Sequence, residues 1–366
     1  MAYPEAPRPG RLGDPDMSLA TEPRLHPGLL TALQHHGLHE LSYLTSELTT
    51  DAPLDAIKSF ASQNEAAIET LYNNLDYTVA GVSSSSHLTR SEKAIPGPDG
   101  NQVTLTIHRP TDSLEKPLPA VIYYHGGGMV ILKTHNRMHT TWAEALARTG
   151  LVVITVDFRN TLAGPSFNPF PAGLNDCAAA VHWVHEHREQ LRISKVALQG
   201  ESGGGNLALA AALKAKREGW IAAIDGVCAS VPYISGAYGL PLAWRLRELP
   251  SLVECDGYLI SCATSALNAK LYDPSGDHAK NPLAWPYWAT EEDMQGLPPH
   301  LIVTSELDPL RDEGIAYCRK LVRAGVRAVG KTNLGVIHEG ELFLRQTLPD
   351  VFLSSLGDIK SFIDSL

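Results

Sequence analysis

The sequence contains little of what marks several classes of protein. Its five cysteines among 366 residues are odd in number and include no CxxC pair, so neither a disulfide framework nor a cysteine-rich zinc site is expected. No stretch approaches the roughly 18 consecutive apolar residues of a membrane-spanning helix, and the N-terminus lacks the apolar region of a signal peptide. These absences predict a cytoplasmic protein with no stable membrane insertion.

Basic charge is also scarce. Lys and Arg number 30 against 40 Asp and Glu, which gives a formal charge of −10. Nucleic acids and anionic membranes bind basic patches, so neither is expected as a partner. Histidine is common, but the groups His35, His36, His39 and His182, His185 lack a third ligand at a known spacing, so no metal is expected.

What the sequence does have is apolar residues in two successive patterns. From about residue 29 to 77 they recur at helical spacing, which predicts amphipathic helices. From about residue 85 short apolar runs alternate with helical patterns. The runs expected to form strands are VTLTIHRP, AVIYY, LVVITV, KVALQ, GVCASV, HLIVTS and RAVGKTNL. The first of them follows the turn signal PDGN and is expected to leave a hairpin.

Strands that are apolar throughout and separated by helices predict an α/β fold with a mostly parallel central sheet covered by helices on both faces. A segment rich in Pro, Trp and Tyr, residues 232–299, interrupts this alternation and predicts either a lid or additional core packing. We therefore expect an N-terminal helical segment over residues 1–85 and an α/β catalytic domain over residues 86–366, with the insertion within 232–299.

The stretch GESGGGN places Ser202 between Gly200 and Gly204, in the spacing G-x-S-x-G, at a point where a predicted strand meets a predicted helix. A serine on such a tight turn stands clear of the sheet if its neighbours carry almost no side chain. The N-terminus of the following helix favours a negative charge at the turn. A phosphate-binding glycine loop is the competing interpretation, but the Lys-Ser/Thr ending of a P-loop is missing.

A second glycine cluster, HGGG, follows the predicted strand AVIYY. Backbone N–H groups of Gly127 and Gly128 are open to a substrate oxygen there, because no side chain blocks the approach. Together with the N–H of Gly203, which follows the serine, they are expected to form an oxyanion hole.

A serine nucleophile needs a base and an acid that orients the base, in the chain order Ser, acid, His. Asp308 falls in the loop after the strand HLIVTS and is the preferred acid, with Glu306 or the pair Asp312 and Glu313 as alternatives. His338 follows the last predicted strand and is the expected base. His125 is expected to hold the glycine loop in place.

With HGGG, GESGGGN, DPLRDEG and His338 in this order, roughly residues 85–366 resemble the hormone-sensitive-lipase-like branch of the α/β hydrolases. The resemblance implies a cofactor-free carboxylesterase or lipase with Ser202, Asp308 and His338 as its triad. It also implies a helical cap formed by the N-terminal helices and part of residues 232–299. The implied partner is a small-molecule ester, expected to be apolar, with a macrocyclic lactone as one candidate.

The chain departs from the family pattern beside the triad, where Glu201 precedes the serine and Glu339 follows the histidine. We expect these changes to alter the shape of the pocket and to leave the chemistry intact. Two other functions stay open: a binding protein of receptor type on the same fold, and an amidase that uses the same triad. The oligomeric state is not readable from the sequence.

Overall fold

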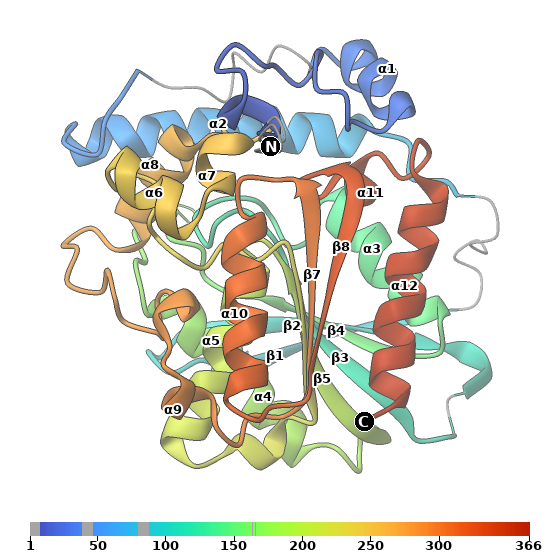
Figure 1. Cartoon of the computed structure of the whole chain (residues 1–366). Coiled ribbons are helices and arrows are strands. Elements are labelled where there is room, and N and C mark those ends of the chain that lie inside the picture. The colour runs from blue at the N-terminus through green and yellow to red at the C-terminus, as the bar shows by residue number, and fades with distance from the viewer. Residues whose placement is uncertain (1–7, 39–46, 80–87, 114, 163, 165) are drawn as a thin grey trace.

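The computed structural model describes residues 8–38, 47–79, 88–113, 115–162, 164 and 166–366 (Figure 1). Its centre is an eight-stranded sheet in the order β1-β2-β4-β3-β5-β6-β7-β8. The strands are β1 Leu88–Pro96, β2 Gln102–Pro110, β3 Leu118–Tyr124, β4 Val152–Asp157, β5 Ile193–Glu201, β6 Gly226–Ser230, β7 His300–Leu307 and β8 Ala328–Ile337. β1 and β2 form the predicted antiparallel hairpin, β2 is antiparallel to β4, and the remaining pairs are parallel.

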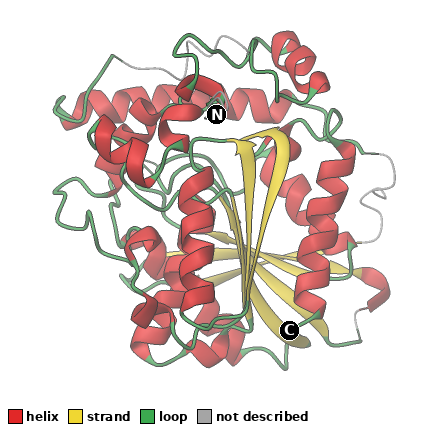
Figure 2. Ribbon diagram, viewed as in Figure 1, coloured by secondary structure: helices red, strands yellow, loops and turns green. Residues whose placement is uncertain are grey.

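Helices cover both faces of the sheet (Figure 2). They are α3 Arg137–Arg148, α4 Ala172–Glu186, α5 Gly203–Glu218, α10 Arg311–Arg323 and α12 Pro349–Asp364. α3 contacts α12, and α4 contacts α5. α10 and α12 flank β7 and β8 from opposite sides (Figure 1). The central strands are buried along nearly their whole length, as expected for parallel strands between two helical layers.

Further helices lie beyond one end of the sheet, where β7 and β8 end (Figure 1). From the N-terminal part come α1 Pro27–His35 and α2 Leu54–Asn74, and from residues 232–299 come α6 Leu242–Glu248, α7 Ser251–Glu254 and α8 Cys262–Tyr272. The short helix α9 Glu291–Met294 lies at the opposite end, near the start of β7, and contacts α10 (Figure 1). α2 contacts α8. The remaining short elements are α11 Gly340–Phe343 and the 3-10 turns η1 Gly10–Leu12, η4 Thr111–Ser113, η5 Ile221–Ala223 and η6 Pro286–Trp288.

The predicted strands and helices are confirmed in their order, and the α/β fold with a mostly parallel sheet is confirmed with them. The expected boundary near residue 85 lies outside the described residues. In the segment 232–299, Tyr238, Tyr258 and Trp285 are buried in the core, whereas α8 lines a cavity. Core packing and cavity lining are therefore both present, and the role of this segment as part of a cap stays a prediction.

The described helices were also compared with what a membrane-spanning helix requires. Over the described ranges, which omit residues 39–46 and 80–87, no helix combines the length and the apolar character required to cross a bilayer.

Candidate active site

Ser202 occupies a strained turn between β5 and α5. Its φ of 52° and ψ of −117° lie in a region that non-glycine residues rarely adopt. A Cβ built on Gly204 would lie 1.9 Å from the carbonyl oxygen of Tyr124, and one on Gly200 would lie 2.3 Å from the carbonyl carbon of Gly204. Both glycines are therefore required sterically, because the turn packs directly against the end of β3.

The HGGG loop lies against this turn. Gly127 and Gly128 have φ values of 105° and 63°, which glycine adopts without steric cost. A Cβ on Gly203 would come within 2.6 Å of the backbone nitrogens of Gly128 and Met129. Within the part of the chain that the structure describes, the N–H groups of Gly127, Gly128 and Gly203 donate to no protein acceptor. The expected donors of the oxyanion hole are thus brought together and left open.

Asp308 and His338 follow the ends of the neighbouring strands β7 and β8, as the sequence predicted. Nδ1 of His338 lies 2.8 Å from Oδ2 of Asp308, and both side chains are buried. The N–H of Leu310 donates to Oδ1 of Asp308 at 2.9 Å and holds the carboxylate in place. Burial lowers the pKa of His338, but the charge and hydrogen bond of Asp308, with smaller contributions from Glu339 and Glu341, raise it to about 9.

The alternative acids bind elsewhere. Glu306 accepts a hydrogen bond from the N–H of Gly335, and Asp312 accepts one from the N–H of Ser251. Glu313 accepts from the N–H of Ile234 and the hydroxyl of Tyr238. Of the acids that follow β7, Asp308 is the one that contacts His338.

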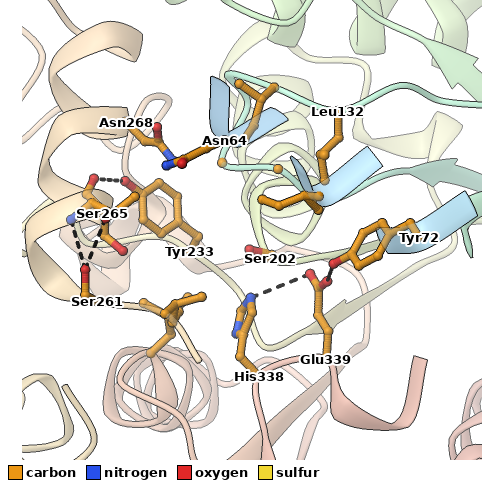
Figure 3. Close-up of a pocket in the computed structure, with 17 residues that line it drawn as sticks. Asn64, Tyr72, Leu132, Ser202, Tyr233, Ser261, Ser265, Asn268, His338 and Glu339 are labelled. Atoms are coloured by element: carbon orange, nitrogen blue, oxygen red, sulfur yellow. Dashed lines mark hydrogen bonds and ion pairs between the residues drawn. The ribbon is translucent and has the colours of Figure 1, made fainter. Parts of the chain in front are cut away.

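Ser202 and His338 line one cavity (Figure 3). Gly127 and Gly128 form part of its floor, and α2 and residues 260–268 contribute to its walls. Apolar side chains make up much of the lining: Ile68, Ile131, Leu132, Ile260 and Leu310. Ser202, His338, Gly127 and Gly128 therefore face a common space with a largely apolar lining.

Two buried carboxyl groups, next in sequence to Ser202 and His338, were not assigned a role from the sequence. Oε1 of Glu201 accepts hydrogen bonds from the hydroxyl of Tyr123 at 2.7 Å and the N–H of Gly126 at 2.9 Å. Oε1 of Glu339 lies 3.6 Å from Nε2 of His338. Burial raises the pKa of Glu201 to about 8, with a further contribution from Glu339, and burial also raises the pKa of Glu339. The two carboxyls therefore oppose each other's ionisation.

Glu339 also has an unusual backbone, with a φ of 53°. Its Oε2 lies 3.5 Å from the hydroxyl of Tyr72 on α2. In the sequence, Glu201 and Glu339 stood out only as departures from the family pattern next to Ser202 and His338. No spacing rule relates them, since their electrostatic interaction depends on how the ends of β5 and β8 meet beside Gly126, where a Cβ would lie 2.8 Å from Oε1 of Glu339 and 3.6 Å from Cγ of Glu201.

His125 is buried and stacks between the rings of His139 and Phe158, with centroid distances of 4.9 Å and 4.5 Å. Its Nδ1 lies 2.7 Å from the carbonyl oxygen of Gly126, which agrees with a role in holding the loop. The described residues contain no group of three His, Cys, Asp or Glu side chains arranged to hold a metal ion. His39, one of the ligands considered above, lies outside them.

Residues 121–341 match the α/β hydrolase fold family, which is more than half of the chain. The chain belongs to this family. A search of solved structures finds brefeldin A esterase, described as a bacterial homologue of human hormone sensitive lipase, with 44% identity, a TM-score of 0.95 and 98% of each chain covered. Esterase Est22 is 35% identical with a TM-score of 0.81, over 94% of this chain and 99% of that one.

Curated relatives agree with these structures. Esterase LipI of Mycobacterium tuberculosis is 33% identical over 64% of this α/β hydrolase and 69% of its own length. Carboxylesterase NlhH of the same species is also 33% identical, over 57% of this chain and 62% of that protein. The resemblance to the hormone-sensitive-lipase-like esterases, and to bacterial brefeldin A esterase in length and motif placement, is confirmed.

Proposed function

We propose that this carboxylic ester hydrolase cleaves its substrate through an acyl-enzyme intermediate on Ser202. The single observation that carries the proposal is the hydrogen bond of 2.8 Å between Nδ1 of His338 and Oδ2 of Asp308, made at a cavity that Ser202 also lines. This bond fixes the imidazole so that Nε2 is the nitrogen available to the serine hydroxyl.

In the first step Nε2 of His338 takes the proton of the Ser202 hydroxyl while Oγ attacks the carbonyl carbon of the ester. The carbonyl oxygen becomes an oxyanion and accepts hydrogen bonds from the N–H groups of Gly127, Gly128 and Gly203. The tetrahedral intermediate then collapses. The bond to the alcohol oxygen breaks, and the alcohol leaves with the proton that His338 held.

In the second step His338 takes a proton from water, and the resulting hydroxide attacks the acyl carbon. Collapse of the second oxyanion breaks the bond to Oγ of Ser202, and His338 returns the proton to the serine. Asp308 stabilises the positive imidazole in both steps. For a cyclic ester the acid and the alcohol remain in one molecule, so the product is a single hydroxy acid.

Two other functions considered from the sequence have less support. A receptor-like protein on this fold dispenses with the catalytic histidine, whereas here His338 is present and hydrogen-bonded to Asp308. Amide hydrolysis uses the same groups, and matched ester and amide substrates separate it from esterase activity. The relatives named above are called esterases and carboxylesterases.

The proposed substrate is a small, apolar ester, in keeping with the apolar lining of the cavity. A macrocyclic lactone is a specific candidate, because the chain is 44% identical to brefeldin A esterase over 98% of its length. No cofactor is needed for the chemistry proposed here. We also propose that α2 and α8 act as the cap over the cavity, since both contribute to its walls.

The proposal is tested by replacing the nucleophile. Ser202→Ala is expected to lower kcat for a chromogenic short-chain ester by several orders of magnitude, on the order of a millionfold, because the triad acts as a unit. Circular dichroism is expected to show an unchanged fold. Ser354→Ala, exposed on α12, is the matched control and is expected to keep full activity. Full activity in Ser202→Ala would refute the proposed nucleophile.

A further inference from the structure

The cavity above Ser202 contains more polar side chains than the ester reaction uses. Most of them have a structural partner. Tyr233 donates to the carbonyl oxygen of Ser265, and Ser261 caps α8 by accepting from the N–H of Thr264. Among the described residues, the side-chain amides of Asn64 and Asn268 have no hydrogen-bond partner in the protein.

Asn64 stands where an apolar residue is expected. It lies on the face of α2 that carries Ile57, Ala61, Ile68 and Tyr72, at intervals of three and four residues. The side chain is only 6% exposed. Its amide borders the cavity and has no hydrogen-bond partner in the protein, so an apolar side chain of similar size would be the more stable choice at this position.

Asn268 lies close to the reaction centre. Its Nδ2 is 3.5 Å from the position that a Cβ on Gly128 would take, so the amide borders the glycine loop proposed to hold the oxyanion. Figure 3 shows Asn64 and Asn268 at the same end of the cavity, with Ser202 between them and the pair His338 and Glu339. Two helices from distant parts of the chain thus each contribute one amide to the same part of the site.

We propose that Asn64 and Asn268 together bind a hydroxyl group of the substrate, so that the preferred substrates are esters with a hydroxyl near the scissile carbonyl. This inference rests on the proposed function. A hydroxyl group both donates and accepts a hydrogen bond, which matches the carbonyl oxygen and NH₂ group that an amide offers.

Other polar groups fit the pair less well. A ketone oxygen only accepts, so it would leave the amide oxygens without a donor. An anion would need a compensating cation, but the described residues that line the cavity include no Lys or Arg, and the imidazole of His338 already faces the carboxyls of Asp308 and Glu339. The ligand group that fits this site is therefore uncharged and able both to donate and to accept a hydrogen bond, and the rest of the ligand is apolar like the cavity lining.

The test compares matched ester pairs that differ by one hydroxyl. On the acyl side the pair is p-nitrophenyl butyrate and p-nitrophenyl 3-hydroxybutyrate, and on the alcohol side it is ethyl butyrate and 2-hydroxyethyl butyrate. For the wild type we expect a higher kcat/KM for the hydroxylated ester in at least one pair. In Asn64→Leu and in Asn268→Leu this preference is expected to fall about tenfold, and the affected pair identifies the side that carries the hydroxyl.

Asn74→Leu is the matched control, because Asn74 is exposed at the end of the same helix. The melting temperature of Asn64→Leu is expected to be equal to or above that of the wild type, which a purely structural asparagine would not allow. If Asn64→Leu fails to fold, Asn268→Leu provides the same ratio of kcat/KM values between the hydroxylated and the unsubstituted ester.

The inference is overturned if the wild type does not prefer the hydroxylated ester in either pair, or if the preference is unchanged in the folded variants. Hydrolysis of the unsubstituted esters by the wild type would show that the proposed function stands independently.

Discussion

The protonation of one nitrogen, Nε2 of His338, controls the proposed reaction. This nitrogen must be free of its proton to act as a base toward Ser202. Asp308 on one side of the ring and Glu339 on the other favour the protonated form, and they raise the pKa of His338 to about 9 against the effect of burial. Activity is therefore expected to increase with pH through the neutral range, to be half-maximal near pH 9 and to level off only above that pH.

Glu339→Gln tests the contribution of the second carboxyl. Removing its negative charge leaves the imidazolium less stabilised, so the pKa of His338 falls. The rising limb of kcat/KM against pH is then expected to shift to lower pH, while the amide keeps the shape of the side chain. The measurement is a pH profile with a chromogenic ester between pH 5 and about 10.

Glu92→Gln serves as the control, since Glu92 is exposed on β1, where it pairs with Arg90. Its pH profile is expected to match that of the wild type. If the rising limb of the pH profile of Glu339→Gln stays in place or moves to higher pH, Glu339 does not act on His338 through its charge.

At the scale of elements, the site depends on how closely β5, the serine turn and α5 approach β3. Gly204 is the tightest point, because a Cβ there would lie 1.9 Å from the carbonyl oxygen of Tyr124 and 2.7 Å from that of His125. Both oxygens belong to backbone at the end of β3, which cannot move aside without displacing the glycine loop. The fold and the geometry of the proposed oxyanion hole thus depend on the same glycine.

Gly204→Ala is accordingly expected to destabilise the protein by about 3 kcal/mol or more, as overpacking of a rigid core does. Gly357→Ala is the matched substitution in α12, where a Cβ would meet nothing within 4 Å. It is expected to stabilise the protein by about 0.5–1 kcal/mol through helix propensity. Denaturant unfolding of both variants measures the difference, and equal stabilities would contradict the packing argument.

The elements and the triad candidates could be predicted because their signals are local. Apolar runs marked the strands, the spacing of Gly200 and Gly204 marked the serine turn, and Asp308 and His338 each follow a strand. The electrostatic interaction of Glu201 with Glu339 and the contact of α2 with α8 could not be predicted. They join parts of the chain far apart in sequence, and their geometry is set by tertiary packing that no periodicity records.

At the scale of the whole molecule, buried titratable groups couple stability to pH. Burial raises the pKa of Glu201 and of Glu313 to about 8, and the pKa of His338 is raised to about 9. A group whose pKa is higher in the folded state holds a proton that the unfolded chain has released, so its stabilisation disappears as pH rises. Buried histidines with lowered pKa values, such as His125 at about 3 and His300 at about 4, have the opposite effect only below about pH 6.5.

The free energy of unfolding is therefore expected to decrease between about pH 6.5 and 9, with a slope of about 1.4 kcal/mol per pH unit for each proton released. Urea unfolding across this range measures the slope. Glu313→Gln removes one of the titrating groups and is expected to make the slope smaller. A stability that is constant or increasing from pH 6.5 to 9 would contradict this balance of buried groups.

The central claim, that Ser202 carries the acyl group and His338 activates it, is tested most directly by covalent labelling. The protein is incubated with a serine-reactive p-nitrophenyl phosphonate, and the modified residue is located by mass spectrometry of its peptides. We expect one phosphonyl group per chain, attached to Ser202, with no label in Ser202→Ala and much slower labelling in His338→Ala. A label on a different residue, or stoichiometric labelling of Ser202→Ala, would contradict the account.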